Sequence, residues 1–197
     1  MTEPSNKHLV RLGSQIGITL FEEFFINLKM DRKILERIEY TYAGQSSEVI
    51  MSIALVKWKE SKLENLEDPT LNDLSDALAA MTLDTHIICQ VFREDMELQL
   101  DEFADFKLCE TPGDDVLKAL SYQIGNCALQ LGIELGVTLY GVESSFIKFP
   151  KDLPGLLEDI LKKWKNESKV ATFYSLMMAL KLVNGGGVRY LRKLLLN

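Results

Sequence analysis

The sequence contains little proline, cysteine or histidine, and it has no low-complexity segment. Of its 197 residues, 5 are proline, 3 are cysteine and 2 are histidine. So few prolines, with no biased segment, favour an ordered chain over an extended linker protein. No signal-peptide pattern opens the chain, so we expect a protein that is not secreted.

The cysteines form no Cys-x-x-Cys pair and are odd in number, which predicts reduced thiols and a cytoplasmic location. Cys89 and Cys127 lie on apolar helix faces and are expected to behave as small core residues. Cys109 lies in a less regular segment and is the cysteine expected to be exposed.

No catalytic or metal-binding pattern occurs either. His8 and His86 have no cysteine or carboxylate at a zinc-ligand or triad spacing. Gly185-Gly186-Gly187 could hold an anion through its N–H groups, but no Lys-Ser or Lys-Thr follows it, so a loop into the last helix is favoured. We therefore expect no enzyme, no cofactor and no metal.

Membranes and nucleic acids are also not expected as partners. The most apolar segment, residues 124–142, contains Asn126, Gln130 and Glu134, which indicates buried helix and turn rather than a membrane span. The positive charge of the second half is spread thinly and lacks the interleaved aromatic residues typical of nucleic-acid binding.

What the sequence does contain is one helical pattern that occurs twice. Apolar residues at i, i+1, i+4, i+5 and i+8 form one face of a helix, and both copies end in one of the chain's two tryptophans. A tryptophan in this place is a large core anchor, so we expect both indoles to be buried. The two sets are Ile50, Met51, Ala54, Leu55 and Trp58, and Leu156, Leu157, Ile160, Leu161 and Trp164.

Weaker repeats on both sides of this pattern, at spacings of about 102 to 108 residues, extend the duplication over the chain. They predict an all-α protein with two helical bundles, residues 1–98 and residues 113–197. Residues 99–112 break the periodicity and end at Pro112-Gly113, so we interpret them as a linker. The apolar residues Phe103, Phe106 and Leu108 predict that this linker packs on one domain or between both.

Local signals place the helices of the first bundle. Lys7–Met30 predicts one long helix or two short ones that meet near Gly17. Asp31 is expected to be an N-cap, and Asp68-Pro69 the start of a further helix. The sixth helix is expected from about Asp84 to Gln99.

These core positions resemble the death-domain superfamily. The second copy resembles the death domains of caspase-recruiting adaptors, and the first copy is similar but looser. The resemblance implies two six-helix Greek-key bundles in tandem and homotypic docking to other death-domain proteins in apoptotic or innate-immune signalling. It is carried in the second copy by Leu135-Gly136-Val137, Val142-Glu143, Pro150, Leu156–Trp164 and Ala171–Leu176, and in the first copy by Leu28–Met30, Ile34-Leu35, Ile38-Glu39, Trp58 and Leu71–Leu78.

The charge is unevenly divided. Residues 1–98 hold 10 basic and 17 acidic side chains, whereas residues 113–197 hold 11 basic and 8 acidic ones. An acidic half joined to a basic half favours head-to-tail contact, within one chain or between chains. The candidate protein-binding residues are Lys162, Lys163, Lys165, Lys169, Arg189 and Arg192 on the basic half, and Glu22, Glu23, Glu36 and Glu39 on the acidic half.

Three functions remain open at this point. The first is a signalling adaptor that assembles complexes through homotypic interactions. The second is a decoy or regulator whose two domains dock on each other and block recruitment. The third is a helical scaffold or carrier protein.

Overall fold

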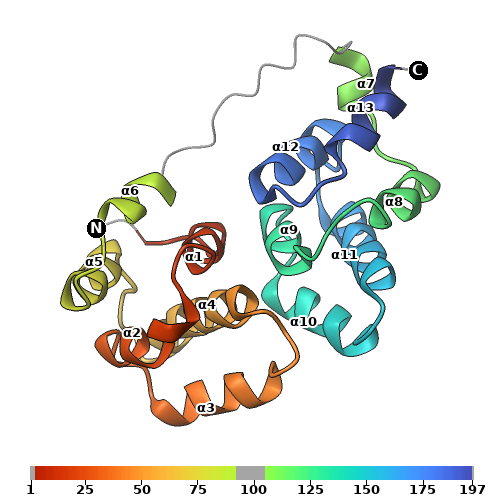
Figure 1. Cartoon of the computed structure of the whole chain (residues 1–197). Helices are drawn as coiled ribbons and strands as arrows, with labels where there is room; N and C mark the ends of the chain where they lie inside the picture. Colours follow the sequence, from red (N-terminus) through yellow and green to blue (C-terminus); the bar gives the residue numbers. More distant parts are fainter. Residues whose placement is uncertain (1–2, 92–104, 197) are drawn as a thin grey trace. The chain divides into compact units, whose positions relative to one another are not determined.

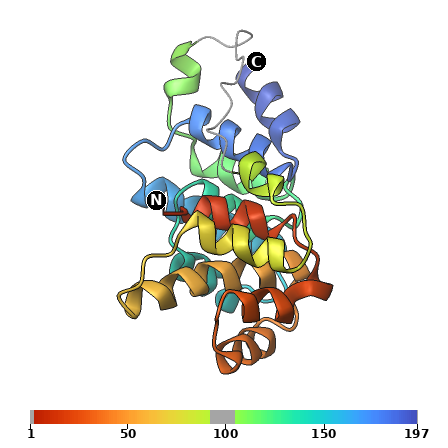
Figure 2. The ribbon, with the colours of Figure 1, turned by 90° about the vertical axis from the view of Figure 1, so that its left-hand side faces the viewer.

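The computed structural model describes residues 3–91 and 105–196, and within these ranges it is all-helical (Figures 1 and 2). The described residues contain no β-strand, only one isolated bridge between Ile124 and Gly186. The chain divides into two compact units, Met1–Met96 (unit 1) and Glu97–Asn197 (unit 2). The predicted all-α class is therefore confirmed.

Unit 1 is built around its longest helix, α4, which contacts α1 and α3, while α2 contacts α5. Thirteen of the eighteen residues of α4 are not exposed, because α4 lies in the middle of the unit. The elements of unit 1 are α1 (Asn6–Gly13), η1 (Ile18–Leu20), α2 (Phe21–Asn27), α3 (Arg32–Thr41), α4 (Ser47–Glu64), α5 (Leu71–Ala80) and α6 (His86–Val91).

Capping side chains fix the starts of α1, α3 and α5 in unit 1. The Asp31 carboxylate accepts a hydrogen bond from the Lys33 N–H at 2.8 Å, as predicted for this N-cap. The predicted helix start at Asp68-Pro69 is wrong by two residues. Thr70 is the N-cap of α5, because its hydroxyl and the Asp73 carboxylate form a reciprocal capping box.

The segment Lys7–Met30 forms two short α-helices rather than one long helix. α1 ends at Gly13 and α2 begins at Phe21, with η1 between them. Gly13 lies so close to α4 that a Cβ there would be 2.9 Å from the Ser52 backbone. Glycine is therefore the residue that allows α1 and α4 to approach each other.

Unit 2 has the same kind of core around α11, which contacts α8, α9 and α10. Its elements are α7 (Asp105–Cys109), α8 (Asp114–Ser121), α9 (Ala128–Glu134), α10 (Leu139–Lys148), α11 (Leu153–Glu167), α12 (Phe173–Val183) and α13 (Val188–Leu196).

Three helix pairings of unit 1 recur in unit 2. The contacts α1–α4, α2–α5 and α3–α4 of unit 1 have counterparts in α8–α11, α9–α12 and α10–α11 of unit 2. The capping box of α5 at Thr70 also recurs in α12 at Thr172, 102 residues later. The repeat seen in the sequence thus corresponds to a repeat in how helices are paired and capped.

The predicted linker and the predicted sixth helix both extend beyond the described residues, and the described part of the linker contains a short helix. The predicted linker contains α7, whose Lys107 ammonium donates to the Leu195 carbonyl at 2.8 Å, and Leu108 is buried in unit 2. Residues 99–104 of that linker, with Phe103, lie outside the described residues. The same holds for residues 92–99 of the predicted sixth helix, of which His86–Val91 is described as α6.

The cysteines divide between core and surface. Cys127 is buried, as predicted, and Cys109 is exposed, as predicted. The prediction for Cys89 is wrong: it is exposed because α6 turns Ile88 and Val91 inward instead. Within the described ranges, no helix has the length and apolar character that crossing a membrane requires.

Candidate interaction surface

The predicted basic surface of unit 2 begins on α11, whose buried face fixes where its lysines emerge. Asp152 caps the helix by accepting from the Gly155 N–H at 3.0 Å. Trp164 is 2% exposed and Leu161 is fully buried, so the predicted core residues are confirmed in this unit. In unit 1, Trp58 is 1% exposed, Leu55 is fully buried, and the Trp58 indole N–H donates to the Leu28 carbonyl at 3.3 Å.

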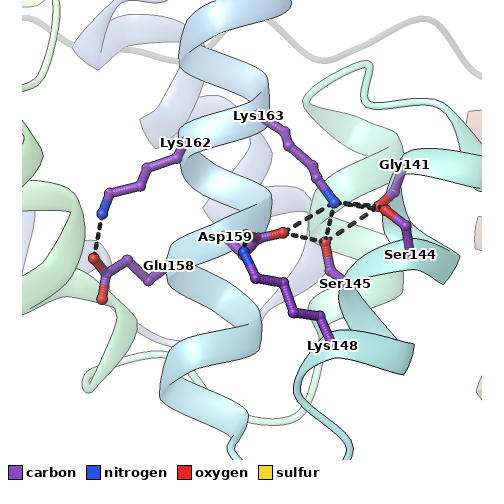
Figure 3. A network of polar contacts seen from close by, with 8 residues as sticks. All are labelled: Gly141, Ser144, Ser145, Lys148, Glu158, Asp159, Lys162 and Lys163. Carbon is purple, nitrogen blue, oxygen red and sulfur yellow. Dashed lines mark hydrogen bonds and ion pairs between the residues drawn. The ribbon is translucent and has the colours of Figure 1, made fainter.

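Lys163 does not extend into solvent but reaches back to α10 (Figure 3). Its ammonium donates to the Gly141 carbonyl at 2.8 Å and to the hydroxyls of Ser144 and Ser145 at 2.7 Å each. It also pairs with the Asp159 carboxylate at 2.9 Å. Because an ammonium has three donors, these four oxygens satisfy it fully.

Asp159 is the second centre of this network. It accepts from the Ser145 hydroxyl at 2.7 Å and from the Lys148 ammonium at 2.8 Å (Figure 3). Burial opposes ionisation of this carboxyl, but the hydrogen bonds from Lys148, Lys163 and Ser145 outweigh it and lower its pKa to about 2. Asp159 therefore stays ionised throughout the physiological pH range and ties α10 to α11.

The other two lysines of the predicted α11 cluster are also paired. Lys162 pairs with Glu158 at 2.6 Å, one turn earlier, and this hydrogen bond raises the pKa of Lys162. Lys165 pairs with Asp114 of α8, and this hydrogen bond lowers the pKa of the Asp114 carboxyl. The α11 lysines thus face three carboxylates of their own unit, which reduces the positive charge they offer to a partner.

The remaining basic candidates have no carboxylate partner among residues 105–196. Lys169 follows α11 and is exposed, and Arg189 is exposed in the first turn of α13. Arg192 is half-buried, and its Nε is a buried atom without a hydrogen-bond partner in the described part of the chain. The uncompensated positive charge among these candidates therefore lies outside α11.

The acidic candidates of unit 1 lie on two helices that contact each other, α2 and α3. Arg32 bridges them by pairing with Glu22 at 3.1 Å and with Glu36 at 3.3 Å. Glu23 and Glu39 are exposed and have no cationic partner within residues 3–91. The structure thus gathers the four glutamates on neighbouring helices and leaves two of them unpaired.

Large apolar side chains, which the charge analysis did not single out, are exposed on corresponding helices of the two units. On α10, Tyr140 is 80% exposed and Ile147 is 82% exposed, seven residues apart and so on one face. On α3, the counterpart of α10, Tyr40 is 87% exposed. Tyrosine is enriched at protein–protein interfaces, so these exposed side chains are candidates for contact with a partner.

Comparison of this chain with protein-family models, with curated proteins and with solved structures finds no match.

Proposed function

We propose that this chain is a non-enzymatic adaptor that assembles signalling complexes through its two helical bundles. The repeated helix pairing and capping support two bundles of one kind. The resemblance of the sequence to death domains extends the proposal to Greek-key bundles that dock on other death-domain proteins in apoptotic or innate-immune signalling.

The observation that carries the proposal is the pair of exposed apolar side chains on one face of α10, Tyr140 and Ile147, together with the exposed Tyr40 on α3. Burying Tyr140 and Ile147 against a partner contributes binding free energy, since exposed apolar area is removed from water. The unpaired glutamates of unit 1 and the unpaired basic residues of unit 2 then supply orientation and association rate rather than most of the affinity. Head-to-tail self-association of the chain fits this division of charge.

The test is self-association of the full chain, measured by light scattering at several protein and salt concentrations. We expect Tyr140→Ser combined with Ile147→Ser to weaken association at least about tenfold. Tyr122→Ser is the matched control, because Tyr122 is an exposed tyrosine of unit 2 that lies outside α10. Association that is equally strong in the double variant and the parent would place the interface elsewhere.

The charge division also favours a second candidate, a regulator whose acidic and basic units dock on each other within one chain. This candidate predicts a monomer at every protein concentration in low salt, with a hydrodynamic radius that grows when salt screens the charges. The adaptor instead predicts particles whose size grows with protein concentration, and salt weakens their association only in part because apolar contacts supply most of the affinity.

A further inference from the structure

Unit 2 contains a pocket between the end of α12 and the first turn of α13. Its volume is about 400 Å³, within the range of small-molecule sites. Its lining residues are Gln123, Leu180, Lys181, Asn184, Gly186, Gly187, Val188, Arg189 and Tyr190.

The loop that forms one wall of this pocket is fixed to the rest of unit 2. The Gly125 N–H donates to the Gly185 carbonyl at 2.7 Å, and Ile124 forms a bridge with Gly186. Gly187 lies against the core, since a Cβ there would be 3.0 Å from Leu120 and 3.1 Å from Ile124. The wall is therefore formed before any ligand arrives, which lowers the entropic cost of binding.

The lining carries positive charge without compensation. Lys181 and Arg189 line the pocket, and no acidic residue does. Neither side chain has a carboxylate partner within residues 105–196, whereas Lys148, Lys162, Lys163 and Lys165 of the same unit are all paired. Two cations that share one concave site without a counter-charge raise the local potential and favour an anion.

We propose that this pocket binds a small phosphate ester. A phosphate dianion balances the charges of Lys181 and Arg189, and a guanidinium donates to phosphate oxygens in bidentate fashion. The volume exceeds the needs of a phosphate ion alone, and Leu180, Val188 and the Tyr190 ring offer apolar surface to an organic group. The amides of Gln123 and Asn184 supply neutral donors for its hydroxyl groups.

The experiment is a titration of the ¹⁵N-labelled full chain with adenosine monophosphate, with ribose 5-phosphate and with adenosine, followed by amide resonances. We expect both phosphate esters to shift the signals of Gly186 and Gly187 saturably, and adenosine to leave them unchanged. Arg189→Gln and Lys181→Gln should each weaken binding about tenfold or more. The indole signals of Trp58 and Trp164 show that each variant remains folded.

Lys169→Gln is the matched control, because Lys169 is another exposed cation of unit 2 without a carboxylate partner and does not line the pocket. It should bind both esters as the parent does.

The proposal is contradicted if Lys169→Gln weakens binding as much as Arg189→Gln does, because the esters would then respond only to the overall positive charge of unit 2. It is also contradicted if adenosine binds as tightly as its monophosphate, because no phosphate would then be recognised. Absence of saturation by either ester in the millimolar range would also overturn the proposal. So would shifts of Gly186 and Gly187 that depend only on protein concentration, because acidic groups of a second copy would then occupy the pocket.

Discussion

Lys163 ties α11 to α10 through three hydrogen bonds. Its side chain is only 25% exposed, and its ammonium satisfies oxygens from three residues of α10 as well as Asp159 on its own helix. Removing Lys163 takes a charged donor away from these partly buried oxygens, and the hydrogen bonds that remain among Ser144, Ser145 and Asp159 replace it only in part.

We therefore expect Lys163→Met to lower the free energy of unfolding of unit 2 by about 2 kcal/mol. Lys162→Met is the matched control, since Lys162 pairs with Glu158 on the same helix at a more exposed position, and it should leave stability almost unchanged. Urea unfolding followed at the Trp164 indole resonance measures both. Equal stability of the two variants would show that the network contributes little.

Asp159 gives unit 2 a defined acid sensitivity. Its folded pKa of about 2 lies below its ordinary value of 3.8, so the unfolded chain takes up the proton first as the pH falls. The resulting stabilisation, about 2 kcal/mol, is complete above roughly pH 5 and is lost progressively as the pH falls through 4 toward 2. Asp159→Asn should be less stable near neutral pH and should lack this part of the pH dependence. Parallel stability curves for variant and parent, measured by urea unfolding from pH 2 to pH 7, would contradict this assignment.

At the scale of the element, the capping box that starts α5 at Thr70 and α12 at Thr172 stabilises a helix start in each unit. Thr172 caps α12 by accepting from the Ser175 N–H at 3.3 Å, and the Ser175 hydroxyl accepts from the Thr172 N–H at 3.1 Å. We expect Thr172→Ala to destabilise unit 2 by about 1 kcal/mol and Thr172→Ser, which keeps the hydroxyl, to leave it nearly unchanged. Thermal unfolding of the full chain measures the difference. A serine variant as unstable as the alanine variant would point to the lost methyl group instead of the cap.

The sequence predicts elements well where the signal is local. The stripe that ends at Trp164 and the cap at Asp31 depend on residues within a few positions of each other, and both are observed. The start of α5 was misplaced because Asp68-Pro69 and Thr70 are both competent caps in sequence, and only the reciprocal bond with Asp73 decides between them.

The site was harder to predict because its partners are distant in sequence. Lys163 was predicted as a protein-binding residue of the basic half, but its acceptors include Gly141, 22 residues earlier. Every residue has a backbone carbonyl, so the sequence does not show which carbonyl accepts a hydrogen bond from a distant side chain. For the same reason Lys181 did not stand out as a candidate, since only the fold brings it to the same pocket as Arg189.

At the scale of the whole molecule, each unit holds one of the two tryptophans in its own core. Trp164→Ala removes a buried indole and should cost about 3–5 kcal/mol, a large part of the stability of a small domain. We expect the full-length variant to lose the structure of unit 2 while the Trp58 indole resonance of unit 1 keeps its folded position. Loss of the folded Trp58 resonance in this variant would show that the two units fold as one cooperative body.

The partition of the thiols has a consequence for covalent chemistry. Burial raises the pKa of the Cys127 thiol to about 11, so almost no thiolate forms near neutral pH, whereas Cys89 and Cys109 are exposed, one in each unit. A maleimide should therefore modify two thiols per chain rapidly and the third only when unit 2 opens, which makes the slow phase a measure of that opening. Oxidation should link chains through Cys89 or Cys109. Such dimers persist in high salt and vanish with a reductant. Assemblies held by charge are weakened by high salt and are unaffected by a reductant.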